Sequence, residues 1–412
     1  MMMKFLRTAS RQRLLATLAG MVIVVLGGTA IAVAAAGSGP VPPAKPLAQA
    51  IHDGLAAPPV QGIIADVSFT NHLVPASSLG GSNPILSGAT GRLWLSSDHR
   101  LRLELQSANG DAQVVVNGSS FWVYEPSSKT VYEGSLPAGA HKPDQSPKSP
   151  KEHGLRTVAQ IQSELNRLAA HLNLSGAQPS DVTGQPAYTV RVSPRHDGGL
   201  LGAAELAWDS VHGVPLRFAV YAQNAAAPVI ELKATSISFG PVAASTFDIT
   251  PPSGAKVVKV QTRVAAGGGH ARGRHARHRE ITGTSAVARA LPFALEAPGQ
   301  LVGLPRRSVK LLDWGGHPAA LVTYGQNLGG VAVIEQSATH ARTPAASGGN
   351  KTSRSDERRQ ALNLPTVSVN GVKGQELDTA LGTMVRFTRG GVSFTVIGSV
   401  PPAAADAAAR GL

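Results

Sequence analysis

The chain has 412 residues, a formal net charge of +13 and no cysteine. This length allows two domains with hydrophobic cores. The lack of cysteine excludes disulfides, thiolate metal sites, a cysteine nucleophile and a lipid-modified amino-terminal cysteine. Basic runs at 272–279 and 354–359 lack interleaved aromatic residues. They therefore favour attraction to anionic lipid or cell-wall polymers over nucleic-acid recognition.

Residues 14–36 form an almost unbroken apolar run, and several basic residues precede it within 1–13. The run is long enough to span a bilayer, and the basic flank places 1–13 in the cytoplasm. We therefore expect a single-pass cell-membrane protein with its main domains outside the cytoplasm. Small residues at 34–37 would also suit a signal peptidase, so secretion after cleavage is the alternative. An exported chain without disulfides is typical of a bacterial envelope protein.

After a Pro/Gly linker at 37–45, the apolar spacing in 46–57 predicts a short helix and 63–69 alternates as a strand. A ladder of short strands follows at 91–132. Within it, residues 100–105 alternate leucine with charged side chains. This period of two predicts a sheet with one buried face.

Residues 157–174 carry apolar side chains at spacings of three and four, which predicts a helix with one apolar stripe. A second ladder follows, and its sheet is expected to stop within 247–257. The strands predicted in this ladder are 187–192, 205–208, 215–221, 229–233 and 236–239.

A Gly/His/Arg linker at 261–284 separates this region from a small α+β domain at 285–412, which a polar insertion near 338–360 interrupts. A short helix is predicted at 403–409. The strands predicted in this domain are 309–314, 319–324, 331–336, 366–369, 383–387 and 392–398.

No motif in the sequence predicts catalysis, a cofactor or a metal site. His270, His275 and His278 lie in a Gly-rich cationic run almost free of acids, which favours a solvated linker over a metal site. Asp209 and His212 lie in a predicted hairpin turn, where Asp commonly bonds its own backbone. We therefore expect a protein that is not an enzyme. A hydrolase with an unfamiliar motif is the least favoured alternative.

The order of elements in 46–260 resembles the LolA-like lipoprotein-carrier superfamily. The segments that carry this resemblance are 65–69, 101–105, 114–118, 121–125, 182–188, 206–209, 213–217 and 247–252. The small domain that follows resembles the two-domain arrangement of the RseB/MucB group. The resemblance implies a half-open antiparallel β-barrel covered by helices, enclosing a cavity for acyl chains.

The resemblance implies non-catalytic binding of lipid or lipoprotein acyl chains at the surface of the cytoplasmic membrane. An envelope-stress sensor acting through an anti-sigma-factor-type membrane protein is the alternative. No nucleic-acid partner is expected. Apolar strand residues are candidates for the cavity wall, and packing in a closed core is the other interpretation of the same residues. These candidates are Leu101, Leu103, Leu105, Phe121, Val123, Leu216, Phe218 and Val220.

Overall fold

A computed structural model describes most of the chain. The predicted membrane segment at 14–36 and most of the predicted linker at 261–284 and of the insertion near 338–360 lie outside the described residues. Among the residues that are described, none of the helices has both the length and the apolar character needed to cross a bilayer. The described residues are 39–74, 88–106, 110–136, 156–196, 198–260, 281–314, 317–339 and 364–412.

In this described part, the larger of two sheets has thirteen strands in the order β13-β6-β5-β4-β3-β2-β1-β12-β11-β10-β9-β7, with β8 beside β9. The first six strands are β1 (Gly62–Asn71), β2 (Ala89–Ser96), β3 (Leu101–Gln106), β4 (Ala112–Asn117), β5 (Ser120–Glu125) and β6 (Thr130–Ser135). The later ones are β7 (Leu172–Leu174), β8 (Gln178–Val182), β9 (Gln185–Pro194), β10 (Leu201–Asp209), β11 (Pro215–Ala222), β12 (Ile230–Phe239) and β13 (Lys256–Val260).

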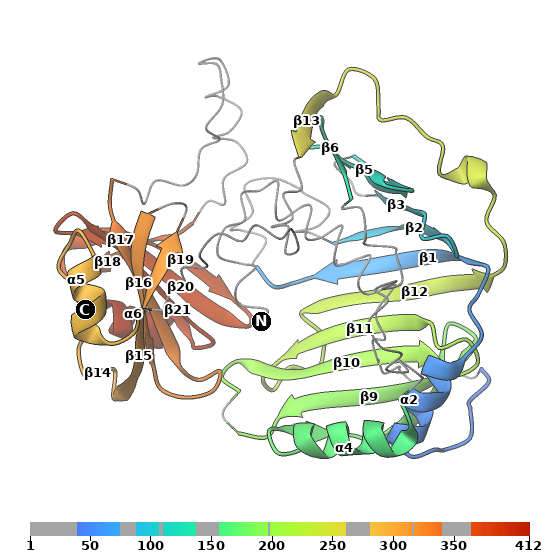
Figure 1. Cartoon of the computed structure of the whole chain (residues 1–412), viewed down its shortest axis with the longest axis horizontal. Helices are drawn as coiled ribbons and strands as arrows, with labels where there is room; N and C mark the ends of the chain where they lie inside the picture. The colour runs from blue at the N-terminus through green and yellow to red at the C-terminus, as the bar shows by residue number, and fades with distance from the viewer. Residues whose placement is uncertain are drawn as a thin grey trace, which may run out of the picture.

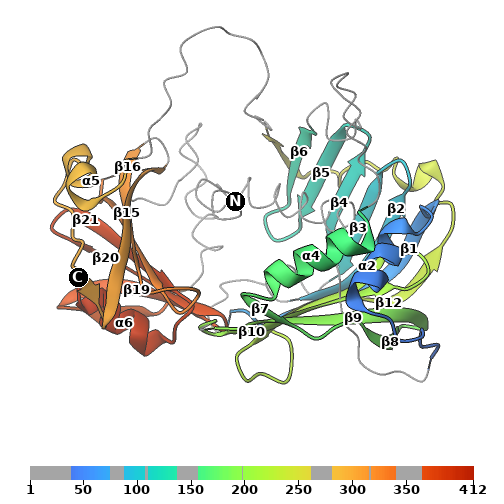
Figure 2. The ribbon, with the colours of Figure 1, turned by 60° about the horizontal axis from the view of Figure 1, so that its bottom comes forward.

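The sheet curves into a half-barrel. Strands β9 to β12 lie side by side, and β2 to β6 rise away from them (Figure 1). Helices α2 (Leu47–Ala56) and α4 (Val158–Leu168) pack together on the inner side of this curve (Figure 2). Ala50 of α2 is buried against Tyr188 of β9 and Trp208 of β10, which fixes the helix pair to the sheet. We call the side of the sheet that carries these helices the inner face.

Helix α4 is shorter than the helix predicted at 157–174. It begins at a capping box in which Thr157 and Gln160 exchange side-chain and backbone hydrogen bonds. It ends at Leu168, because Leu172–Leu174 forms β7 and pairs with β9. The periodic leucines predicted helix here, but pairing with the sheet edge prevails over the last turn.

Strand β13 departs from the predicted topology. The sheet was expected to stop within 247–257, and every strand pair was expected to be antiparallel. Instead the chain crosses the outside of β2–β5 and adds β13 in parallel to β6. Phe247 is buried in this crossing, where the Arg100 guanidinium lies 5.1 Å from its ring and Arg102 donates to the carbonyl of Thr246 at 3.0 Å.

The smaller sheet has eight antiparallel strands within the described residues. Its core packs helices α5 (Thr284–Ala290) and α6 (Pro402–Arg410) against the strands. The prediction missed α5, β14 and β19. The strands are β14 (Gln300–Leu301), β15 (Leu304–Trp314), β16 (His317–Tyr324), β17 (Val331–Ser337), β18 (Thr366–Val369), β19 (Val372–Thr379), β20 (Gly382–Arg389) and β21 (Val392–Gly398).

The two sheets touch through backbone contacts between turns. The amide of Leu200, before β10, donates to the carbonyl of Ser399 at 3.1 Å, and the amide of Ala380 donates to the carbonyl of Leu73 at 3.0 Å. These contacts join the larger sheet to the turns that follow β19 and β21 in the smaller sheet.

Candidate functional site

The inner face carries a row of apolar side chains that crosses four strands. The strand register places Leu206 opposite Phe218, Phe218 opposite Leu232, and Leu232 opposite Phe69. Leu206 lies two residues from Trp208 on β10, so the row is on the side that carries the helices. Phe218 is 39% exposed and Leu232 is 37% exposed, while the other two are half-buried. We call these four residues the apolar row.

Helix α4 presents further apolar surface on the same side. Of its described residues only Ile161 is buried, and Leu168 is 49% exposed. A surface helix normally buries its apolar stripe. Here the stripe of α4 and the apolar row are both incompletely covered. Helix α4 lies on the inner side of the half-barrel (Figure 2). The stripe of α4 and the apolar row together offer a surface on which an apolar ligand can bind between helix and sheet.

The predicted cavity-wall residues divide into three groups. Leu101, Phe121 and Val123 are buried in one cluster, and half-buried Leu103 packs against it. Leu105 is buried in the neighbouring cluster, which Leu103 also contacts. These five residues therefore form the packed core of the half-barrel wall, which is the closed-core interpretation.

The three predicted residues of β11 behave differently. Phe218 and half-buried Val220 lie on the inner face, as the alternation predicts. Leu216 is buried in a separate cluster with Val182, Ala187 and Ala207, and half-buried Leu206 packs against this cluster. The register of β10 and β11 shifts beside it, between Ala207 and Trp208.

Sequence reasoning did not single out the other members of the apolar row. Phe69 lies in the alternating segment 63–69, which was predicted as a strand. Leu206 and Leu232 also lie in predicted strands. The register of the paired strands brings these three residues beside Phe218, and sequence patterns do not predict that register.

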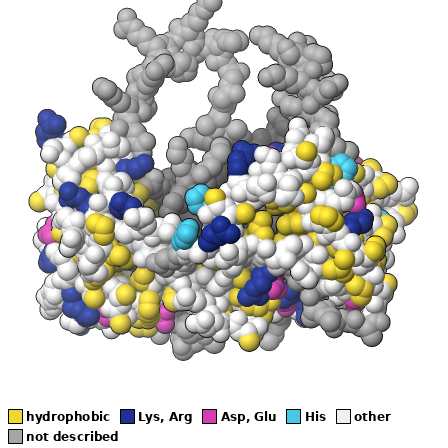
Figure 3. Space-filling model, turned by 90° about the horizontal axis from the view of Figure 1, so that it is seen from below, with side chains coloured by type: hydrophobic (Ala, Val, Ile, Leu, Met, Phe, Trp, Pro, Cys, Tyr) yellow, Lys and Arg dark blue, Asp and Glu magenta, His cyan; other side chains and the backbone are white. Residues whose placement is uncertain are grey.

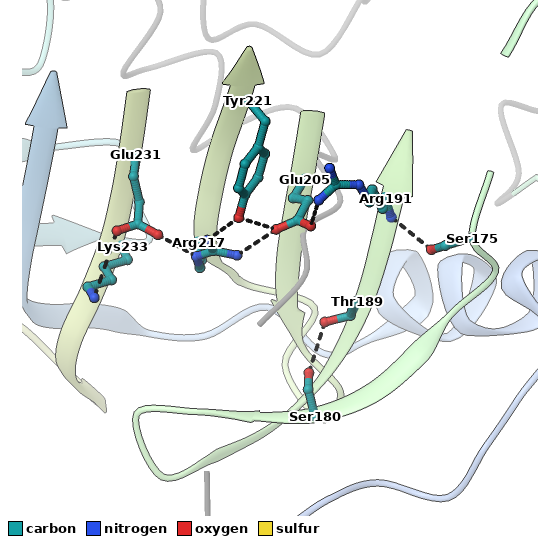
Figure 4. Close-up of polar contacts among 9 residues, drawn as sticks. All are labelled: Ser175, Ser180, Thr189, Arg191, Glu205, Arg217, Tyr221, Glu231 and Lys233. Atoms are coloured by element: carbon teal, nitrogen blue, oxygen red, sulfur yellow. Dashed lines mark hydrogen bonds and ion pairs between the residues drawn. The ribbon is translucent and has the colours of Figure 1, made fainter. Parts of the chain in front are cut away.

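The opposite face of β9–β12 carries a network of charged side chains (Figure 4). Glu205 accepts hydrogen bonds from Arg191 at 2.5 Å, Tyr221 at 2.7 Å and Arg217 at 3.0 Å, and Arg217 also donates to Glu231 at 2.7 Å. Burial alone would raise the pKa of Glu205, but these donors bring it below its ordinary value. Because the groups satisfy one another, the network holds the four strands in register behind the apolar row.

The described residues contain no group of three or more metal-ligating side chains. His270, His275 and His278 lie outside them. Asp209 has the predicted turn role, because its Oδ1 accepts the backbone amides of Val211 and His212.

A cleft of about 480 Å³ lies where the two sheets meet. His196 lines it from the larger sheet, and Leu304, Pro305, Gln326 and Asn327 line it from the smaller one. Figure 3 shows histidine and basic side chains close to this junction. The cleft therefore offers side-chain amides and an imidazole beside apolar surface.

No family model and no curated protein matches the sequence. Solved structures do. A chain of the MucA/MucB complex of Pseudomonas aeruginosa is 18% identical, with 89% of this chain and 95% of that chain covered at a TM-score of 0.36. A crystal structure of MucB in complex with MucA(peri) is 16% identical, with the same coverage and a TM-score of 0.37. A LolA superfamily protein from Nitrosomonas europaea is 9% identical and covers 50% of this chain and 99% of that chain, at a TM-score of 0.19.

The two groups that the sequence resembles, the LolA-like carriers and the RseB/MucB proteins, are thus both represented among the similar solved structures. The identities are below 20% and the TM-scores below 0.4. What this chain binds must therefore be inferred from its own residues.

Proposed function

We propose that the protein binds acyl chains of a lipid or lipoprotein, without catalysis, on the outer side of the cytoplasmic membrane. The observation that carries this proposal is the exposure of Phe218 and Leu232 in mid-strand on the inner face, in one row with Phe69 and Leu206. Large apolar side chains grouped in a concave surface favour a ligand that removes them from water.

The row has dimensions that suit an acyl chain. Four neighbouring strands span roughly 14 Å at about 4.8 Å per strand spacing. A chain lying along the row could bury on the order of ten methylenes, each contributing about 0.8 kcal/mol before the costs of association. Such a ligand needs no specific polar contact.

The location follows from the sequence at 14–36. If this segment is retained, it holds the half-barrel at the membrane surface, where it can accept or present a lipid. If it is removed, the protein is free to diffuse. Both forms place the apolar row outside the cytoplasm.

The proposal is tested on protein purified from a bacterium that exports the full chain. Native mass spectrometry and solvent extraction should recover bound acyl lipid, and the extracted protein should bind a fluorescent fatty acid. Protein that carries no lipid and takes up no fatty acid would reject the function.

A second candidate function is envelope sensing through a membrane protein of the anti-sigma-factor type. The cleft at His196 supports it, because Gln326 and Asn327 there can pair with the backbone of an extended peptide. A MucB structure similar to this chain is that of a complex with MucA(peri). Cross-linking in membranes should then recover a partner with wild type and lose it with Asn327→Asp or Gln326→Glu; recovery of the same partner with both variants would argue against the cleft.

A further inference from the structure

Asp181, near the end of β8, has a buried carboxylate oxygen without a donor. The residue is only 8% exposed. Its Oδ1 accepts the amide of Gly184 at 3.3 Å, whereas Oδ2 is buried and has no hydrogen-bond partner within the described part of the chain. A buried carboxylate oxygen is costly unless a donor or a positive charge compensates it. Asp181 therefore points to a missing cationic donor.

Gly39 lies directly against this oxygen. A Cβ atom built on Gly39 would come within 2.0 Å of Asp181 Oδ2. Standard bond lengths put a backbone nitrogen about 2.5 Å from its own Cβ position, so the nitrogen of Gly39 lies within about 4.5 Å of Oδ2. The segment that follows is fixed to the same strands, because Tyr188 donates to the carbonyl of Pro43 at 2.6 Å.

The sequence before Gly39 has the features of an export-processing site. The apolar run at 14–36 is followed by Ala36, Gly37 and Ser38, so small residues occupy the first and third positions before the Ser38–Gly39 bond. This is the pattern at which signal peptidases cut.

We propose that the Ser38–Gly39 bond is hydrolysed during export and that the new α-ammonium group of Gly39 forms a buried ion pair with Asp181. Water adds across the peptide bond, the carboxylate of Ser38 leaves with the removed segment, and the amine of Gly39 takes up a proton. A signal peptidase of the exporting cell supplies the catalyst. The ammonium has three donors and no side chain beside it, which is what the close approach to Asp181 requires.

The ion pair between Gly39 and Asp181 forms only after the Ser38–Gly39 bond is cut. It fastens the segment before α2 to β8, and α2 is part of the cover over the inner face. The cover therefore becomes fully anchored only in the exported, processed protein. This favours removal of 14–36 over its retention as an anchor, and it places the cut two residues after the small residues at 34–36.

The test starts from the full chain exported by a bacterial host. Edman sequencing and intact mass should show that the purified protein begins at Gly39. The protein is then treated with an amine-acylating reagent across a pH series. A free α-amino group titrates at about 7.7–8.0, and a buried ion pair should move the onset of acylation at least one pH unit higher. A start at any other residue, or an onset near pH 8, would overturn the proposal.

Asp181→Asn supplies the matched comparison, with Asp111→Asn as the control because Asp111 is an exposed aspartate. At neutral pH, Gly39 of Asp181→Asn should be acylated at least ten times faster than Gly39 of the wild type and of Asp111→Asn. Equal rates in all three proteins would contradict the ion pair. If Asp181→Asn fails to fold, the pH series on the wild type still decides.

Discussion

Phe218 is the residue that best separates the two interpretations of the inner face, a closed core and a surface that binds a ligand. A closed core would bury it, yet it is 39% exposed in the middle of β11. Its neighbour across the strands, Leu232, is exposed to nearly the same degree. A side chain of this size contributes little to stability while it faces water, so it is available for contact with a ligand.

Replacing Phe218 should therefore weaken binding more than folding. We expect Phe218→Ser to lower the affinity for a fluorescent fatty acid at least ten-fold, because it removes the most exposed apolar side chain of the row. The free energy of unfolding in urea should change by about 1 kcal/mol or less. Val211→Ser is the control, because Val211 is 59% exposed but lies in a turn. Equal losses of affinity in both variants would contradict the site.

Glu335 is a second informative residue, because it is a fully buried carboxyl group in β17. One oxygen accepts the amide of Glu296 at 2.9 Å, and the other has no partner among the described residues. Burial raises the pKa of Glu335 to about 7, with the Glu296 carboxyl adding to the rise. Burial and the charge of Glu335 in turn raise the pKa of Tyr324 to about 12.

The raised pKa of Glu335 makes the stability of the folded protein depend on pH in one direction. Between about pH 4.5 and 7 the folded state keeps the proton of Glu335 that the unfolded state has released, so stability falls as the pH rises through this window. We expect Glu335→Gln to remove that fall and to stabilise the smaller sheet at pH 8 by roughly 2–3 kcal/mol. Urea unfolding of both proteins at pH 5, 6.5 and 8 measures the free energy of unfolding. Parallel pH dependences in the two proteins would show that Glu335 is not the titrating group.

At the scale of elements, α4 has few contacts that hold it to the sheet. Only Ile161 is buried, and the capping box satisfies the backbone amides of Thr157 and Gln160 at its first turn. A cover held by packing this sparse is the part of the half-barrel best able to move for a ligand.

Removing the cap should loosen this cover without unfolding the protein. Thr157→Ala is expected to cost α4 about 1 kcal/mol. Amide hydrogen exchange of α4 should become faster, and a bound fluorescent fatty acid should dissociate faster. Thr90→Ala, at an exposed threonine of β2, is the control. Unchanged exchange in α4 would show that the cap does not limit its opening.

Most elements follow from local pattern, whereas their pairing does not. The alternation at 100–105 and 63–69 predicted β3 and β1 closely. The second ladder was predicted as two strands at 229–233 and 236–239, but the structure forms one, β12, with a register shift opposite Asp66 and Val67. A break in alternation looks like a turn in sequence, and only the partner strand shows that it is a bulge.

For the candidate site, the sequence predicted which residues share a face of one strand, and ligand binding there stays a prediction. Phe218 and Val220 lie on one face of β11, as the alternation predicted. Periodicity cannot rank core against cavity, because that depends on what covers the face, and Leu101 and Phe121 proved to be core. The register shift beside Leu216 depends on the pairing between β10 and β11, which no local pattern contains.

At the scale of the whole molecule, the half-barrel and the smaller sheet meet through Gly199 and Leu200. The φ of Gly199 is +60°, and a Cβ there would lie 2.2 Å from the carbonyl oxygen of Ser399. No larger residue fits without moving one sheet from the other. Among the described residues, the close contact of Gly199 with Ser399, the Leu200–Ser399 bond and the Ala380–Leu73 bond join the two sheets.

Gly199→Ala should separate the two sheets at this contact. Small-angle X-ray scattering is expected to show a larger radius of gyration, and protease cleavage near 197–200 should become faster. Gly118→Ala is the matched control, because Gly118 also has φ +60° but nothing lies within 4 Å of its Cβ position. Identical scattering of Gly199→Ala and Gly118→Ala would show that the contact does not set the arrangement.

The central claim is that an acyl chain lies along the apolar row. A fatty acid carrying a photoactivatable diazirine on its chain, bound to the protein purified after export of the full chain, tests it most directly. After illumination, peptide mass spectrometry should place the label on the row, at Phe69, Leu206, Phe218 or Leu232, and excess unlabelled fatty acid should prevent it. Label confined to the charged face around Glu205, or label that excess fatty acid does not displace, would contradict the account.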